Sequence, residues 1–140
     1  MLLTWLLLFM PGGVEAQPVQ YIAVQGRLAC ARKPLPNTEV KLFHKRLIGS
    51  TILAVAKTDK DGNFKLEGGI PSRFPMDAHL KINHTCKEKW PCRRIVDIKV
   101  PAPYVYRGSG NPEWLSAGTL DMTFKYPNQK RMCTIRQENN

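Results

Sequence analysis

The chain has 140 residues, which favours a single domain. Its 21 Lys and Arg residues outnumber its 11 Asp and Glu residues, and the net charge of +10 favours anionic partners, namely acidic lipid, acidic glycan or nucleic acid. No segment after residue 16 is apolar enough to span a membrane, which excludes a protein with several membrane spans.

An apolar run, LLTWLLLF, occupies residues 2–9. Val14-Glu15-Ala16 follows shortly after, and it places suitable small or apolar residues three before and one before a cut after Ala16. We therefore predict a signal peptide over residues 1–16, with an amino-terminal membrane anchor as the alternative, and a secreted, extracellular protein with no transmembrane segment in its mature chain. Export makes nucleic acid the least favoured of the anionic partners, and we expect none to be bound.

The first half of the remaining chain alternates apolar and polar residues, a pattern with the period of a strand. This alternation predicts strands over residues 21–30 and 39–45. Residues 51–58 are apolar on both parities, which predicts a central strand covered on both faces. Asp-Gly at residues 61–62 predicts a tight hairpin turn into a strand over residues 64–68.

The second half of the chain predicts three further strands, over residues 78–84, 94–101 and 118–126. Residues 131–137 are predicted to form either a last short strand or a tail that packs against the domain. The inward positions that the alternation predicts are Ala78, Leu80, Ile82, Val96, Ile98, Val100, Leu120, Met122 and Phe124.

Seven or eight short strands, each with one apolar face, predict an all-β fold: a β-sandwich of two packed sheets over residues 17–136. Residues 137–140 are expected to form a flexible tail. The longest irregular stretch, residues 101–116, is rich in Pro, Gly and Ser, and loops of that length are frequently functional.

Four cysteines, Cys30, Cys86, Cys92 and Cys133, predict two disulfides in a small exported chain. Four cysteines allow three pairings. Cys86 and Cys92 bracket a short turn, so we pair them with each other, which leaves Cys30 to pair with Cys133. A zinc site is the competing interpretation, but the spacing lacks a two-residue chelating knuckle and no histidine pair lies nearby, so no metal is expected.

The segment around the two central cysteines carries further signals. Asn83-His84-Thr85 is a glycosylation sequon near a strand end, on an outward position. The densest basic cluster of the chain follows it, and a tryptophan among cations suits a lipid headgroup boundary. The alternative is that the indole packs over the disulfide while the charges are merely solvated. The candidate residues for binding an anionic surface are Lys87, Lys89, Trp90, Arg93 and Arg94.

Aromatic residues in and beside the long irregular stretch form a second candidate site. Tyr104, Tyr106 and Trp114 lie where exposed side chains could contact a protein receptor on a cell surface.

The chain resembles the nematode transthyretin-like family through ordered landmarks: VQGRLACARKPLPNTEVKLF, TDKDGNFKLEG, LKINHTC with a following cysteine, VPAPYV, and AGTLDMTFKYP with a late cysteine. The resemblance implies a secreted transthyretin-type sandwich of two four-stranded sheets. It also implies a first strand parallel to the penultimate one, which would bring Cys30 toward Cys133. The resemblance also implies an extracellular role, because some members of that family act as bridging proteins that recognise phosphatidylserine exposed on dying cells.

The enzymes that share this fold, the 5-hydroxyisourate hydrolases, end in the tetrapeptide YRGS. Here YRGS occupies residues 106–109, far from the carboxyl end, and the first predicted strand lacks the histidine that those enzymes need. No other catalytic motif is visible. We therefore expect no enzyme activity and no cofactor.

These observations together predict a secreted, non-enzymatic extracellular binding protein that recognises phosphatidylserine membranes or acidic glycans, or bridges them to a receptor. The alternative is a carrier of a small apolar ligand, held between the sheets or at a dimer interface. A hydrolase of the hydroxyisourate type ranks third. The sequence gives no oligomeric state.

Overall fold

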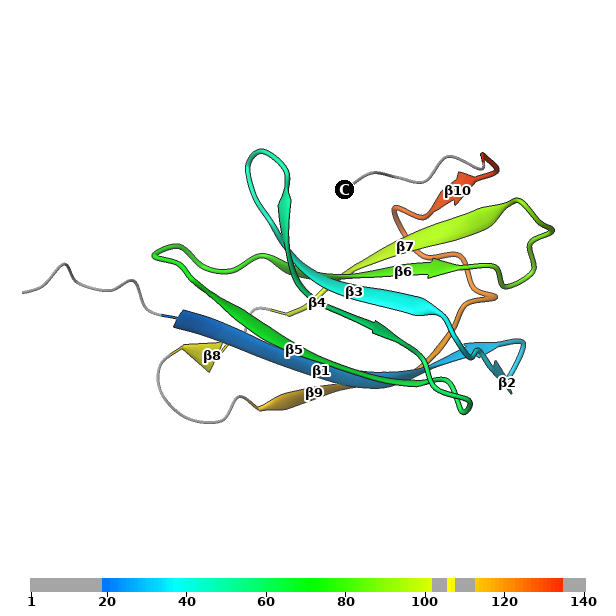
Figure 1. Ribbon diagram of the computed structural model, residues 1–140, viewed down its shortest axis with the longest axis horizontal. Coiled ribbons are helices and arrows are strands. Elements are labelled where there is room, and N and C mark those ends of the chain that lie inside the picture. Colours follow the sequence, from blue (N-terminus) through cyan, green and yellow to red (C-terminus); the bar gives the residue numbers. More distant parts are fainter. Residues whose placement is uncertain (1–18, 102–105, 108–112, 135–140) are drawn as a thin grey trace, which may run out of the picture.

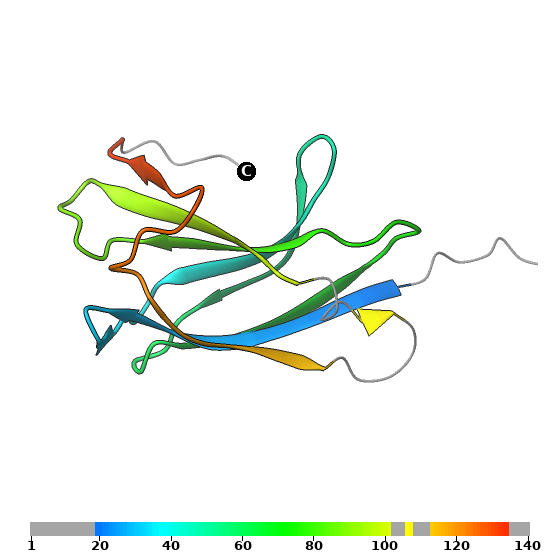
Figure 2. The same cartoon turned by 180° about the vertical axis from the view of Figure 1, so that it is seen from behind.

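The computed structural model describes residues 19–101, 106–107 and 113–134. They form two packed sheets, as the predicted all-β sandwich requires (Figure 1; Figure 2 shows the same sheets from behind). Sheet A contains β1 (Val19–Cys30), β2 (Lys33–Pro34), β5 (Asn63–Pro71), β8 (Tyr106–Arg107) and β9 (Trp114–Asp121). Sheet B contains β3 (Glu39–Lys45), β4 (Ser50–Lys57), β6 (Ala78–His84), β7 (Arg93–Lys99) and β10 (Lys130–Met132).

Strand β1 organises sheet A because it pairs with all four other strands of that sheet. It runs antiparallel to β5, with Val24 opposite Leu66, and parallel to β9, with Leu28 opposite Leu120. The parallel pairing that the resemblance implied is therefore confirmed. Sheet B is antiparallel, in the order β10-β7-β6-β3-β4.

The core lies between the sheets, where period-2 alternation directs one apolar face of each strand. The predicted inward positions of β6 are confirmed, and Val96 and Val100 are also buried. Fully buried side chains from both layers fill the space between the sheets: Ile22, Val24, Leu28, Val40, Leu42, Ile82, Val96 and Met122.

The prediction of a central, covered strand over residues 51–58 is wrong. Strand β4 lies at the edge of sheet B, and Ile52 and Val55 are 45% and 53% exposed. The Asp-Gly turn also differs from the predicted hairpin, because β4 pairs with β3 in sheet B whereas β5 pairs with β1 in sheet A. The turn therefore carries the chain from one layer to the other, and β1 rather than β4 supplies the partner of β5.

The last predicted inward run ends early. Strand β9 stops at Asp121, and Met122 is buried whereas Phe124 is 67% exposed. A turn follows the strand, in which the Phe124 N–H donates to the Asp121 carbonyl at 3.4 Å, so period-2 alternation no longer applies there. The part of the chain that the structure describes contains no helix with the length and hydropathy of a membrane span.

Candidate functional site

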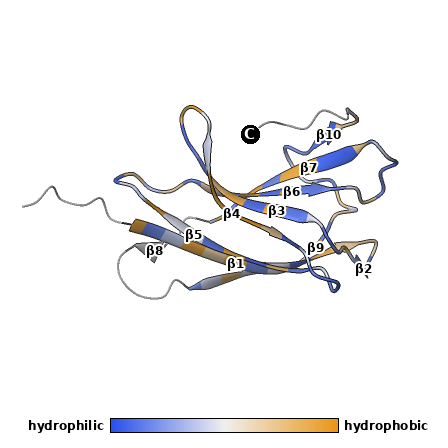
Figure 3. Ribbon diagram, viewed as in Figure 1, coloured by the Kyte–Doolittle hydropathy of each residue, from blue (hydrophilic) through white to orange (hydrophobic). Residues whose placement is uncertain are grey.

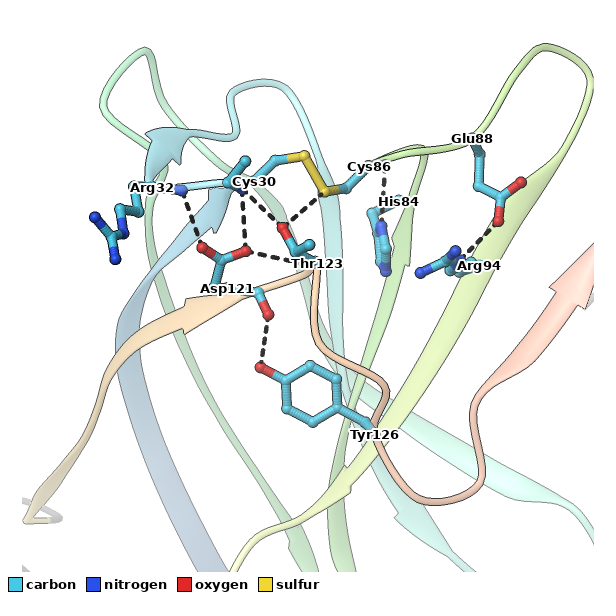
Figure 4. The surroundings of a disulfide bond; sticks show 10 residues. Cys30, Arg32, His84, Cys86, Glu88, Arg94, Asp121, Thr123 and Tyr126 are labelled. Carbon is cyan, nitrogen blue, oxygen red and sulfur yellow. Dashed lines mark hydrogen bonds and ion pairs between the residues drawn. A yellow bond between two sulfur atoms is a disulfide. The ribbon is translucent and has the colours of Figure 1, made fainter.

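The disulfide pairing differs from the predicted one: Cys30 bonds to Cys86, and Cys92 bonds to Cys133. Pairing of β1 with β9 does place Ala29 opposite Asp121, as the parallel arrangement implies. The chain then crosses to sheet B, where Met132 lies opposite Arg93, and this brings Cys133 beside Cys92. Cys86 is thereby left to face Cys30 across the two layers (Figure 4).

The loop between β6 and β7, residues 85–92, is consequently anchored at both ends, with Cys86 near its start and Cys92 at its end. Two turns shape it, since the Glu88 N–H donates to the Thr85 carbonyl at 3.0 Å and the Cys92 N–H donates to the Lys89 carbonyl at 2.8 Å. Anchored ends and internal turns reduce the conformational entropy that this loop would lose on binding.

Trp90 is 84% exposed at this loop, which overturns the alternative that its indole packs over a disulfide. Lys87 and Lys89 are also exposed. An exposed indole that directly follows two exposed lysines in one short loop is the composition that the anionic-surface hypothesis requires.

The two arginines of the predicted basic cluster are less available than the lysines. Arg94 Nε lies 2.6 Å from Glu88 Oε1, and Arg131 Nε lies 3.0 Å from Glu88 Oε2. The hydrogen bond from Arg94 holds the pKa of Glu88 below its usual range. Arg93 is half-buried. Lys87, Lys89 and Trp90 therefore form the exposed part of the candidate site. The ion pair between Glu88 and Arg94, which makes this arginine less available, was not predicted from the sequence.

A cluster of hydrogen bonds around one carboxylate, that of Asp121, lies beside the Cys30–Cys86 disulfide (Figure 4). Asp121 accepts hydrogen bonds from the backbone N–H groups of Ala31, Arg32 and Thr123, at 3.1, 3.0 and 2.9 Å. Hydrogen bonds from Thr123, followed by those from Arg32 and Ala31, hold the pKa of Asp121 well below its usual range. Ala31 and Arg32 both have positive φ angles, so this cluster stabilises a β1–β2 turn that side-chain sterics disfavour.

His84 is buried beside the same disulfide, where its Nδ1 accepts the Cys86 N–H at 3.1 Å. Burial, followed by the charge of Arg94, lowers the pKa of His84 from 6.5 to about 4. Protonation of this ring is therefore unfavourable in the folded protein.

We expect the free energy of unfolding to decrease as the pH falls from 6.5 to about 4. Between these values the unfolded chain binds a proton at His84 and the folded chain does not, so acid favours unfolding. After allowance for screening, the loss is about 2 kcal/mol. Urea titrations at several pH values check this, with His84→Gln as the control. A variant that retains the full loss would show that other groups cause it.

Asn83, the predicted glycosylation site, is half-buried on β6, opposite Glu39 on β3 and Ile95 on β7. Whether it carries a glycan stays a prediction.

His79, which the alternation of β6 places on the outward face, is covered rather than exposed. Phe43 stacks on its ring at a centroid distance of 5.3 Å, and Asp97 Oδ1 lies 2.6 Å from its Nδ1.

Two of the three predicted receptor-contact residues, Tyr106 and Trp114, lie on strands that pair with the first half of β1, far from the basic loop. Tyr106 on β8 pairs with Tyr21 near the start of β1, whereas the disulfide to the 85–92 loop is at Cys30, the end of β1. Trp114 begins β9, is 38% exposed, and has the Lys65 ammonium 5.8 Å from its ring centroid. Tyr104 and the side chain of Tyr106 lie outside the described residues.

A surface hollow of about 560 Å³ lies on the outer face of sheet A. Polar groups contribute much of its lining, including Arg27, Asp59 and Lys65, and Gln25 donates to Ser116 there at 3.2 Å. Such a lining does not favour a small apolar ligand.

Sequence reasoning missed a third group of exposed side chains, Leu47, Ile48 and Phe74. The available signal was RLIGS at residues 46–50, where two large apolar residues stand between an arginine and a glycine in a stretch that must turn.

Comparison with known proteins agrees with this architecture. Residues 25–101 match the model of the transthyretin-like family. Three proteins of Caenorhabditis elegans are similar to most of the chain. Transthyretin-like protein 33 is 33% identical over 89% of this chain and 89% of its own. Transthyretin-like protein 2 is 31% identical over 81% and 82%, and transthyretin-like protein 46 is 30% identical over 90% and 73%. The chain belongs to the transthyretin-like family.

Proposed function

We propose that this protein is a secreted, non-enzymatic extracellular protein that binds anionic membrane surfaces through its 85–92 loop. The observation that carries the proposal is the 84% exposure of Trp90 next to the exposed Lys87 and Lys89, in a loop anchored by two disulfides. An indole prefers the headgroup region of a bilayer, and each nearby cation contributes about 1 kcal/mol toward an anionic leaflet.

The charge and the cysteine chemistry support this proposal. A net charge of +10 attracts an anionic surface over the range of the Debye length. All four cysteines form disulfides, which persist in oxidising compartments and support an extracellular location.

The remaining hypotheses receive less support from the described residues. A carrier site between the sheets would have to displace fully buried side chains such as Ile22 and Leu42. A hydroxyisourate-type hydrolase would need a histidine on its first strand, and β1 of this chain contains none. Receptor contact through Trp114 stays a prediction. Its side chain is 38% exposed, so only part of it is available to a partner.

The test replaces Lys87, Lys89 and Trp90 together with serine. We expect the affinity for phosphatidylcholine vesicles that contain phosphatidylserine to fall by at least about tenfold at low salt, because two cations and the indole are lost. Lys57→Ser with Lys60→Ser is the matched control, since both lysines are exposed and the charge change is equal.

Co-sedimentation measures vesicle binding, and retention on a sulfated-glycan column provides the second arm. Equal vesicle binding by the triple variant and the parent would contradict the proposal. If the parent does not bind vesicles but is retained on the glycan column, and the triple variant loses that retention, the partner is an acidic glycan instead.

A further inference from the structure

Two loops at the other end of the sandwich carry apolar side chains into solvent. Leu47 and Ile48, at the tip of the β3–β4 hairpin, are 103% and 89% exposed, and Phe74 in the β5–β6 connection is 79% exposed. Figure 1 shows the hairpin projecting beyond the sheets, and Figure 3 shows its tip in the orange of hydrophobic residues. The β5–β6 connection enters β6 and the 85–92 loop leaves it, so these loops lie at opposite ends of that strand.

The fold gives no reason for Leu47 and Ile48. The Arg46 N–H donates to the Gly49 carbonyl at 3.0 Å and closes a turn, which places both residues at its two central positions. The positive φ of this turn falls on Gly49, so the backbone conformation imposes no particular residue type at positions 47 and 48. Neither side chain contributes buried area, so a contact outside the chain explains these residues better than folding does.

Phe74 projects from an anchored backbone. The buried Gln20 side chain donates from Nε2 to the carbonyls of Ser72 and Phe74 at 3.0 and 2.7 Å, and its Oε1 accepts the Met76 N–H at 2.8 Å. Met76 itself is buried in the core. The backbone around Phe74 is thus already ordered, and little conformational entropy would be lost when its ring inserts into another medium.

The two loops are joined at their bases. The Lys45 N–H donates to the Asp77 carbonyl at 2.8 Å, and the Asp77 N–H donates to His44 Nδ1 at 3.0 Å. Both loops line one surface hollow of about 550 Å³. The apolar tips therefore form one structural end of the molecule, which we call the apolar end: Leu47, Ile48 and Phe74.

Three cations lie within two residues of these tips in the chain. Lys45, Arg46 and Arg73 are exposed and neighbour the apolar residues in sequence. The carboxylate at the base, Asp77, is turned toward His79, whose Nε2 lies 2.9 Å from its Oδ1. Apolar tips backed by cations match the layering of an anionic bilayer, in which headgroup charge lies outside the hydrocarbon.

We propose that the apolar end inserts into the surface of an anionic bilayer, with Lys45, Arg46 and Arg73 contacting the headgroups. This inference goes beyond the proposed function, because it concerns the opposite end of the molecule and a hydrophobic contact. A second copy of the chain fits less well. Stable protein interfaces bury about 800 Å² on each partner, whereas these tips are convex, and pairing two of them would bring like charges together.

The test measures vesicle retention in about 1 M salt, where electrostatic attraction is screened and hydrophobic insertion persists. We expect the parent protein to keep a fraction bound to vesicles of phosphatidylcholine and phosphatidylserine. Replacing Leu47, Ile48 and Phe74 together with serine should lower this salt-resistant affinity by at least about tenfold. Ile52→Ser with Val55→Ser is the matched control, because both residues are exposed apolar side chains on the edge strand β4.

The outcomes are separable from those of the proposed function. The serine variant of Lys87, Lys89 and Trp90 should lose binding at low salt, whereas the variant of the apolar end should lose the salt-resistant fraction. Absence of any salt-resistant binding by the parent, or equal binding by the tip variant and the parent, would overturn the inference. Self-association of the parent in size-exclusion chromatography that the tip variant loses would assign these loops to a second copy and would also overturn it.

Discussion

Replacing Cys30 and Cys86 together with serine should lower the free energy of unfolding by about 5 kcal/mol. The bridge spans a sequence separation of 56 residues, and the loop-closure entropy of the unfolded chain contributes about 4 kcal/mol on the chain-entropy model. Cys86 is also 3% exposed within the core, so its loss removes packing that adds about 1 kcal/mol.

The second bridge, Cys92–Cys133, provides the comparison. Its separation of 41 residues gives a similar entropic contribution of about 4 kcal/mol, but Cys133 is exposed and adds little packing. Urea unfolding of both double-serine variants without reductant checks the order. A larger loss for the Cys92–Cys133 variant, or a peptide map that links Cys86 to Cys92, would contradict this account.

The second large effect is expected at Gln20. Gln20→Leu should lower the free energy of unfolding by about 3 kcal/mol, because the buried amide makes three hydrogen bonds to the 72–76 backbone and leucine leaves all three groups without that partner. The same change should also release the backbone that positions Phe74. We therefore expect salt-resistant vesicle binding to weaken in this variant at temperatures where it is still folded.

Gln25→Leu is the matched control for that substitution. Gln25 lies on the same strand, but it is half-buried and its hydrogen bond is to the exposed Ser116, so the change should stay within about 0.5 kcal/mol. Thermal and urea unfolding of both variants provide the measurement. Equal losses for the two glutamines would show that the contacts of Gln20 do not stabilise the fold.

Local patterning was enough to predict most strands of this protein. The alternation through residues 78–84 predicted the burial of Leu80 and Ile82 because side chains of a strand point to opposite faces in turn, whatever the neighbours. The same reasoning failed at Phe124, where the strand has already ended, and at β4, whose apolar residues on both parities lie at an exposed edge.

The candidate loop was recognisable from its composition, but its available groups were not. Lys89 and Arg94 look equivalent in a basic stretch, and the local sequence does not show whether Trp90 is buried. Only the folded chain brings Arg94 and the distant Arg131 to the same carboxylate of Glu88, while Trp90 is left in solvent. The apolar end was not predicted for a similar reason, since Leu47 and Phe74 are 27 positions apart and meet only through the hydrogen bonds at the bases of their loops.

The amino-acid sequence by itself determined the all-β class, the family and the presence of two cross-links, because side-chain alternation, ordered landmarks and cysteine number are properties of the linear chain. Tertiary structure alone decided which cysteines bond. Cys86 and Cys92 are only six positions apart in the chain, yet the chain crosses between the layers in such a way that Cys86 lies beside Cys30 and Cys92 lies beside Cys133. Pairing depends on distance in space, and that distance is fixed by strand register across two sheets rather than by separation in sequence.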